Sequence, residues 1–251
     1  MSAETAWYLG VGRDEVADRA ILVGDPGRVD LFAARLSDVT ANGGDRALRT
    51  VTGAFRDRRV TVCSFGMGAP IAVVVLEELA ALGVRAVLRA GTVMSLGEVP
   101  LSTLVLADAA VRGEATSATY LPPDGPAEAD AALTECVAHV LTEAGAPYRR
   151  GLVASYDGFY SQLFAIHDDR RQRIEALADA LRRRGVIAAD METSALLAVA
   201  PLLGVRAASL CLASVDGPSQ RRLDPERRGD DERRLVEAAL EAMHRFEQEE
   251  P

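Results

Sequence analysis

The chain has 251 residues, of which 49% are hydrophobic and 26% are charged. This composition is typical of a globular protein with a sizeable core and excludes a disordered or fibrous chain. Its 28 basic and 37 acidic side chains give a formal net charge of −9, which argues against nucleic acid or an anionic membrane as the main partner.

Short β-rich runs alternate along the chain with longer segments whose apolar residues recur at helical spacing. The predicted strands are residues 20–23, 60–65, 85–90, 103–107, 150–154, 186–189 and 205–213. The predicted helices are residues 70–82, 127–144, 168–183, 192–203 and 230–248. This alternation predicts an α/β fold with a mixed, largely parallel central sheet and helices on both faces, in a single domain spanning residues 1–251.

Two polar segments with proline and glycine, residues 116–126 and 214–228, are predicted to be loops. Long loops in a compact domain are often lids or binding loops. We therefore expect at least one of them to border a functional site.

The sequence argues against several other kinds of functional site. All the basic side chains are arginine, so Schiff-base chemistry and a P-loop lysine are excluded. The three cysteines and three histidines are widely spaced, which predicts neither disulfides nor a metal site. The first ten residues do not form a signal peptide and no apolar run is long enough to span a membrane, so a cytoplasmic protein is predicted.

The first candidate site is GDPGR at residues 24–28, which follows a predicted strand and leads into a helix expected to start near Val29. Free backbone N–H groups at a helix N-terminus, together with the guanidinium of Arg28, make a natural anion site. Asp-Pro-Gly is also an ordinary turn sequence, so a purely structural role stays open.

Two further segments follow predicted strands. FGMGAP at residues 65–70 is a glycine-rich turn before a helix, but it lacks the features of a nicotinamide-binding fingerprint. RAGT at residues 89–92 puts Arg89 near the C-terminal end of an apolar strand. A charge there is costly unless something anionic meets it, and that partner is either a ligand or a carboxylate such as Glu98.

SYDGFY at residues 155–160 places aromatic side chains just beyond a strand, and DMET at residues 190–193 places two carboxylates at a strand-to-helix junction. The aromatic residues could be core residues, and the carboxylates could simply favour the helix dipole. With the arginines they suggest a flat ring bound beside an anion.

These motifs occur together with Arg46, which lies ahead of TGAF at residues 52–55. In its order and spacing, this set resembles the nucleoside phosphorylase family that contains the hexameric purine nucleoside phosphorylases and the uridine phosphorylases. The resemblance covers nearly the whole chain. It implies a nucleoside phosphorylase-like three-layer α/β/α domain.

The resemblance also implies an activity, the reversible phosphorolysis of a purine or pyrimidine nucleoside to a free base and ribose or deoxyribose 1-phosphate. Such an enzyme is a pentosyltransferase of nucleoside salvage that needs no cofactor and uses inorganic phosphate as co-substrate. Phosphate attacks C1′ as the glycosidic bond breaks, so positioning and charge complementarity supply most of the catalysis.

Site residues carry over by position in the motifs. The resemblance implies that Met191, Glu192 and Tyr8 contact the ribose, that Phe159 and Asp190 contact the base, and that Asp216 and Arg89 are catalytic, with Asp216 assisting the leaving base. It implies that phosphate is bound by Gly24, Arg28, Arg46, Arg89 and Thr92. Arg46 would come from a neighbouring subunit, so a homo-oligomer built from dimers, and a hexamer by family likeness, is expected.

Three positions depart from the family pattern. Tyr8 stands where a histidine is usual, and Ile71 replaces a serine. Met94 places a bulky side chain where the base pocket of the family normally has only backbone. These departures leave the base and sugar preference open. They also keep two alternatives in view, a hydrolytic nucleosidase of the same fold and a non-catalytic nucleoside or phosphate-binding paralogue.

Overall fold

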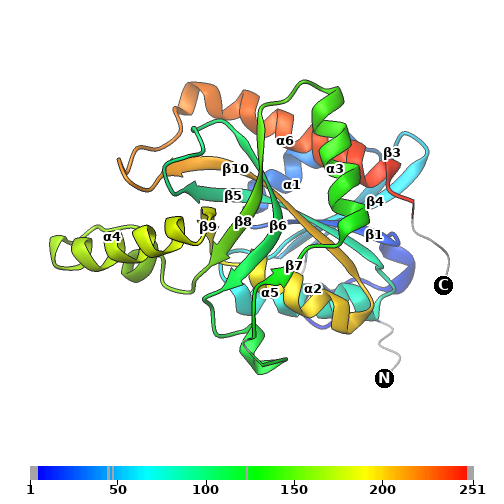
Figure 1. Ribbon diagram of the computed structural model, residues 1–251. Helices are drawn as coiled ribbons and strands as arrows, with labels where there is room; N and C mark the ends of the chain where they lie inside the picture. The colour runs from blue at the N-terminus through cyan, green and yellow to red at the C-terminus, as the bar shows by residue number, and fades with distance from the viewer. Residues whose placement is uncertain (1–4, 44–45, 47, 123, 248–251) are drawn as a thin grey trace.

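The computed structural model describes residues 5–43, 46, 48–122 and 124–247. Its central feature is a twisted mixed sheet with the strand order β10-β6-β8-β9-β5-β1-β4-β3-β2 and the short β7 beside β6 (Figure 1). The strands are β1 (Arg19–Val23), β2 (Ser37–Gly43), β3 (Arg49–Phe55), β4 (Arg58–Ser64), β5 (Ala86–Ser95), β6 (Leu104–Arg112), β7 (Ala127–Glu128), β8 (Tyr148–Ser155), β9 (Val186–Asp190) and β10 (Arg206–Asp216).

All seven predicted strands are present, and β5, β6 and β10 extend beyond their predicted ends. Among the described residues, the prediction of a largely parallel sheet is wrong, because pairings divide evenly between parallel and antiparallel. The parallel pairs are β1–β4, β1–β5, β5–β10, β6–β8 and β8–β9, and the antiparallel pairs are β2–β3, β3–β4, β5–β9, β6–β7 and β6–β10.

The sheet closes on itself, which differs from the simple three-layer arrangement expected. β5 pairs with β10 along its length and with β9 at Met94 and Ser95, so the strands β5, β10, β6, β8 and β9 form a ring. β1, β4, β3 and β2 continue from the first half of β5 as an open sheet. Closure brings the end of β5 beside the β9–α5 junction, although the two are distant in sequence.

Helices cover both faces of the sheet, as predicted (Figure 1). They are α1 (Pro26–Ala33), α2 (Ala69–Ala81), α3 (Ala131–Glu143), α4 (Asp168–Arg183), α5 (Thr193–Val199) and α6 (Pro225–Arg245). Apolar side chains of α2 and α5 belong to one core cluster, and those of α1, α3 and α6 belong to another on the opposite face. The helix α4 protrudes from the body and packs through Leu181 on a third, smaller cluster.

Local capping decides where two helices begin. α3 starts four residues later than predicted, because β7 pairs with β6 and Asp130 then accepts a hydrogen bond from the Leu133 N–H. α6 starts five residues earlier than predicted, because Asp224 caps it and Pro225 suits a first helical position. The predicted loop 214–228 is therefore shortened at both ends, since β10 also continues to Asp216.

No helix in the described part of the chain combines the length and hydropathy that a bilayer span needs.

Leu88, on β5, tests the packing at the centre of the sheet. Its side chain is fully buried in the cluster beneath α1, α3 and α6, so Leu88→Ala should lower the free energy of unfolding by about 2–5 kcal/mol. Urea denaturation measures the change. The half-exposed Val39→Ala on β2 serves as control and should cost well under 1 kcal/mol; equal losses would contradict the described core.

Candidate active site

A cavity of ≈ 700 Å³ opens at the ends of β1 and β5 and at the β9–α5 junction. Ligands in such folds bind where the carboxyl ends of strands meet. Eight of the predicted site residues line it: Gly24, Arg28, Arg89, Thr92, Phe159, Asp190, Met191 and Glu192. Tertiary structure thus brings four separate motifs to one concave surface.

The GDPGR turn forms one wall of this cavity. A Cβ atom on Gly24 would lie 2.9 Å from the carbonyl oxygen of Gly66, so the close approach of the two glycine-rich turns requires glycine at this position. The Asp25 side chain accepts a hydrogen bond from the Gly27 N–H, and α1 begins at Pro26, three residues before the expected Val29. The turn is therefore a capped helix N-terminus facing the cavity.

Arg28 is almost fully buried at this wall. Its guanidinium donates to the Ala90 carbonyl and to Glu232 Oε1 on α6, each at 3.3 Å. Its Nε is buried and has no partner among the described residues. A buried donor without an acceptor is costly, and an anion in the cavity would remove that cost.

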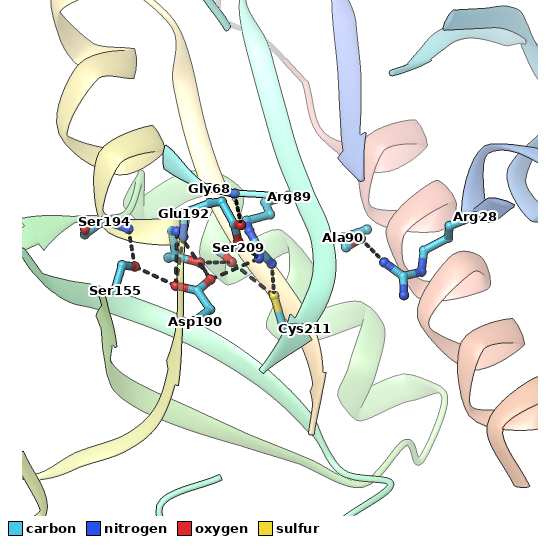
Figure 2. Close-up of polar contacts among 11 residues, drawn as sticks. Arg28, Gly68, Arg89, Ala90, Ser155, Asp190, Glu192, Ser194, Ser209 and Cys211 are labelled. Atoms are coloured by element: carbon cyan, nitrogen blue, oxygen red, sulfur yellow. Dashed lines mark hydrogen bonds and ion pairs between the residues drawn. The ribbon is translucent and has the colours of Figure 1, made fainter. Parts of the chain in front are cut away.

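Arg89 joins several elements from its place on β5 (Figure 2). Its Nη2 lies 2.6 Å from Glu192 Oε2 and 3.1 Å from Asp190 Oδ2. Its Nη1 donates to the sulfur of Cys211 on β10. Its charge is thus met by two carboxylates of the DMET segment, and the suggested partner Glu98 is not one of its ion-pair partners among the described residues.

Burial lowers the pKa of Arg89, but its close neighbours, among them the carboxylates of Asp190 and Glu192, raise it by more, so the guanidinium stays protonated. Burial also raises the pKa of the Cys211 thiol, although Arg89 opposes that shift. A Cβ atom on Gly91 would collide with the Arg89 side chain. Glycine at position 91 therefore leaves the space that this side chain occupies. The glycine of RAGT is therefore required by its neighbouring arginine.

Glu192 is fixed from two sides. Its Oε1 accepts a hydrogen bond of 2.6 Å from the backbone N–H of Gly68, in the FGMG turn, while Oε2 meets Arg89. A carboxylate oxygen accepts more than one hydrogen bond. Glu192 can therefore accept from hydroxyl groups of a ligand while it holds these protein donors.

Asp190 lines the cavity but is occupied by its own surroundings. Its carboxylate accepts hydrogen bonds from the hydroxyls of Ser155 and Thr193 and from the backbone N–H groups of Glu192 and Thr193. These bonds cap the start of α5. The geometry makes Asp190 a partner of Arg89 and of the helix, and does not single it out as a group that contacts a base.

Phe159 lies on a short π-helical turn at the opposite wall. Its ring stacks on Phe164 with a centroid distance of 5.7 Å and an interplanar angle of 9°, and Tyr160 meets it edge-on at 5.1 Å. Because Phe159 also lines the cavity, it offers a supported ring surface to a flat ligand.

Tyr8 and Arg46 lie outside this cavity and contact each other. The guanidinium carbon of Arg46 is 5.6 Å from the centre of the Tyr8 ring. Arg46 is exposed, and the neighbouring Trp7 is 82% exposed. The predicted contacts of Tyr8 with the ribose and of Arg46 with phosphate therefore do not form within one subunit.

Asp216 is not brought to the cavity, which corrects its predicted place beside the leaving base. Its carboxylate accepts hydrogen bonds from the backbone N–H and hydroxyl of Ser219 and stabilises the turn after β10. The two preceding residues, Ser214 and Val215, line the cavity instead. The β5–β10 register is irregular between Ala213 and Val215, so the places of the side chains at this end of β10 do not follow from simple alternation along the strand.

Several lining residues escaped the sequence interpretation. Ser214, Val215 and Arg228 all border the cavity, and Glu232 joins Arg28 to Arg228 with distances of 3.3 and 3.2 Å to the two guanidiniums. The i, i+4 spacing of Arg228 and Glu232 is a signal for one helix, but Arg228 falls in the predicted loop 214–228 and Glu232 in the predicted helix 230–248. Of the departures, Met94 lines the cavity, and Ile71, on α2, is partly buried against the core.

No cluster of three or more histidine, cysteine or acidic side chains among the described residues could hold a metal ion.

Comparisons with known proteins agree with this architecture. The family model of the phosphorylase superfamily matches residues 18–246. The chain is 28% identical over 252 residues to a uridine phosphorylase of Salmonella typhimurium, covering 98% of this chain and 100% of the relative. It is 31% identical over 247 residues to a guanosine phosphorylase of Halorubrum lacusprofundi, covering 94% and 97%. The crystal structure of uridine phosphorylase from Vibrio fischeri is similar with a TM-score of 0.84 and 29% identity, covering 98% of this chain and 100% of that one.

Arg89→Met tests the buried charge network. The change leaves Asp190 and Glu192 buried without their cation, so the free energy of unfolding should fall by about 3–5 kcal/mol at pH 8.

Urea denaturation measures the change. Arg149→Met, which removes an exposed arginine from β8, is the matched control and should change stability little. A loss for Arg89→Met no larger than that of the control would contradict the described network.

Proposed function

This chain belongs to the phosphorylase superfamily, and from that membership we propose that its cavity carries out the reversible phosphorolysis of a nucleoside to a free base and a pentose 1-phosphate. Its relatives include uridine and guanosine phosphorylases over nearly the full length, and the protein is accordingly a nucleoside phosphorylase, a pentosyltransferase. The observation that carries the proposal is the meeting of guanidiniums, a fixed carboxylate and an aromatic face in one cavity.

The phosphate end is proposed to lie between the GDPGR turn and Thr92. Arg28 has a buried Nε without a partner within the described chain. The N-terminal end of α1 lies in the same wall, with the N–H groups of Gly27 and Arg28 already bonded to Asp25. A guanidinium and the positive end of a helix dipole both favour a dianion. Arg89 has a buried free Nε as well, so it can attract phosphate while its Nη2 holds Glu192.

The sugar is proposed to sit against Met191 and Glu192. The Glu192 carboxylate is held rigidly by Gly68 and Arg89, and a fixed acceptor can bind two vicinal hydroxyls without losing much conformational entropy. Such an arrangement orients C1′ towards a phosphate bound at Arg28 and Thr92.

The base is proposed to stack on Phe159. As phosphate oxygen bonds to C1′ and the bond from C1′ to the base nitrogen breaks, the bonding electrons leave with the base. Arg228 lines the cavity near Phe159 and Val215, and we assign to its guanidinium the role of stabilising that negative charge, in place of Asp216. No covalent enzyme intermediate is needed, and phosphate is the co-substrate.

A second copy of the chain is proposed to complete the site. Tyr8 and Arg46 contact each other on an exposed surface, as expected if they reach the cavity of a neighbour. The active unit is then at least a dimer, and family likeness suggests a hexamer made of three such dimers. Residues 1–251 act in this proposal as one domain.

Incubation of the purified protein with purine and pyrimidine nucleosides, with and without inorganic phosphate, tests the reaction. Base release should depend on phosphate and should yield an equal amount of pentose 1-phosphate, because phosphate is the attacking group. Chromatography of the products measures both. Release of free pentose without phosphate would instead indicate a hydrolytic nucleosidase, and release from no nucleoside would favour a binding protein.

Arg46→Ala tests the shared site. The variant should raise the KM for phosphate about tenfold or more, because one guanidinium is lost from the anion site, with little change in the free energy of unfolding. Arg35→Ala, which removes another surface arginine paired with Glu237, is the control. Steady-state kinetics at varied phosphate measures the effect.

Complementation gives a second readout of the same idea. Arg46→Ala and Glu192→Ala chains produced together should recover about a quarter of wild-type sites if partners mix at random, because only one site in each mixed dimer is intact. Activity no higher than that of the separate variants would contradict a site shared between subunits.

A further inference from the structure

A second chamber of ≈ 500 Å³ adjoins the proposed active site. Five residues line both spaces, namely Thr92, Phe159, Ser214, Val215 and Arg228. The chamber therefore continues from the wall on which the base is proposed to stack. Its remaining lining includes Phe164 and Arg222, which the proposed reaction does not use.

The chamber has an aromatic wall that carries a cation. Phe159 stacks in parallel on Phe164, and the guanidinium carbon of Arg222 lies 5.9 Å from the centre of the Phe164 ring. A guanidinium placed over a ring face keeps its N–H groups available in its own plane. Arg222 can thus donate hydrogen bonds to a group in the chamber without losing its contact with Phe164.

The backbone holds Arg222 in this position. Val215 and Arg222 form an antiparallel bridge, and the Leu223 N–H donates to the Ser214 carbonyl at 2.8 Å. On the far side, the amide of Gln220 donates to the Ala165 carbonyl at 3.2 Å, which ties this hairpin to the segment that carries Phe164. Arg222 is therefore placed by a folded hairpin that continues β10.

The carboxylates of the chamber already have partners. Glu232 is shared between Arg28 and Arg228, and Asp224 accepts from the Glu226 N–H at the start of α6. Within the described chain, no carboxylate lies within ion-pair distance of Arg222. Arg222 is exposed and lines the chamber, so its guanidinium is a solvent-accessible charged donor at the chamber wall without a counter-ion among the described residues.

We propose that Arg222 determines the base specificity of this enzyme by binding the acceptor edge of an oxo-base, such as a 6-oxopurine or a 4-oxopyrimidine. This inference rests on the proposed phosphorolysis, because it identifies the far wall of the same base site. A guanidinium only donates hydrogen bonds, so it pairs with carbonyl oxygens and ring nitrogens. The amino group of adenine or cytosine presents N–H donors at the corresponding position and is disfavoured.

Arg222→Leu tests the proposal in the complete protein. For the pairs inosine and adenosine, and uridine and cytidine, wild-type kcat/KM should favour the oxo-base. In the variant, the ratio of oxo to amino kcat/KM should fall about tenfold to a hundredfold for whichever pair is accepted, because the hydrogen bond to the exocyclic oxygen is lost. Arg222→Lys, which keeps the charge, should retain part of the preference.

Arg221→Leu is the matched control, since Arg221 is a neighbouring exposed arginine on the same hairpin that does not line the chamber. It should leave the ratio unchanged. An equal loss on oxo- and amino-nucleosides in Arg222→Leu, or a wild-type preference for amino-bases, would overturn the specificity role while phosphate-dependent release still supported phosphorolysis. A wild-type protein that releases no base from any of the four nucleosides would overturn both.

Discussion

The buried guanidinium of Arg89 holds together four parts of the chain. It belongs to β5 and contacts Cys211 on β10 and the two carboxylates of the β9–α5 junction, and through Glu192 it reaches the FGMG turn before α2 (Figure 2). A charge with so little access to water is stable only when its partners are precisely placed. The walls of the cavity are consequently tied to one another through this residue.

The same requirement explains why the motifs contain the residues they do. Gly91 leaves the space that the Arg89 side chain fills, and Gly24 lets the two glycine-rich turns touch. Asp190 caps α5 while it meets Arg89, so one carboxylate supports both the helix and the ion pair. These motif residues thus have a structural role in the fold as well as a proposed role in binding. A ligand binds the hydrogen-bonding groups that the protein leaves unpaired.

A second ion-pair chain connects the two ends of the site. Glu232 on α6 joins Arg28, beside the proposed phosphate position, to Arg228, at the boundary between the cavity and the adjoining chamber. Arg28 is nearly buried and Glu232 is largely so, so water screens this coupling only weakly. The start of α6 therefore takes part in both phosphate binding and base recognition as proposed here.

The sequence by itself determined the alternation of strands and helices, the seven strands predicted and the family, because apolar periodicity and the ordered motifs are local signals. It missed β2 and β3, and at the GDPGR turn it left open whether the segment is an ordinary turn or an anion site. Only the tertiary structure showed that β5 closes onto β9 and β10 and which residues pair with Arg89. It also showed that Asp216 does not line the cavity, whereas Arg222 and Arg228 line the chamber with Phe159. These depend on strand register and on contacts between residues that are distant in the sequence, which no local pattern encodes.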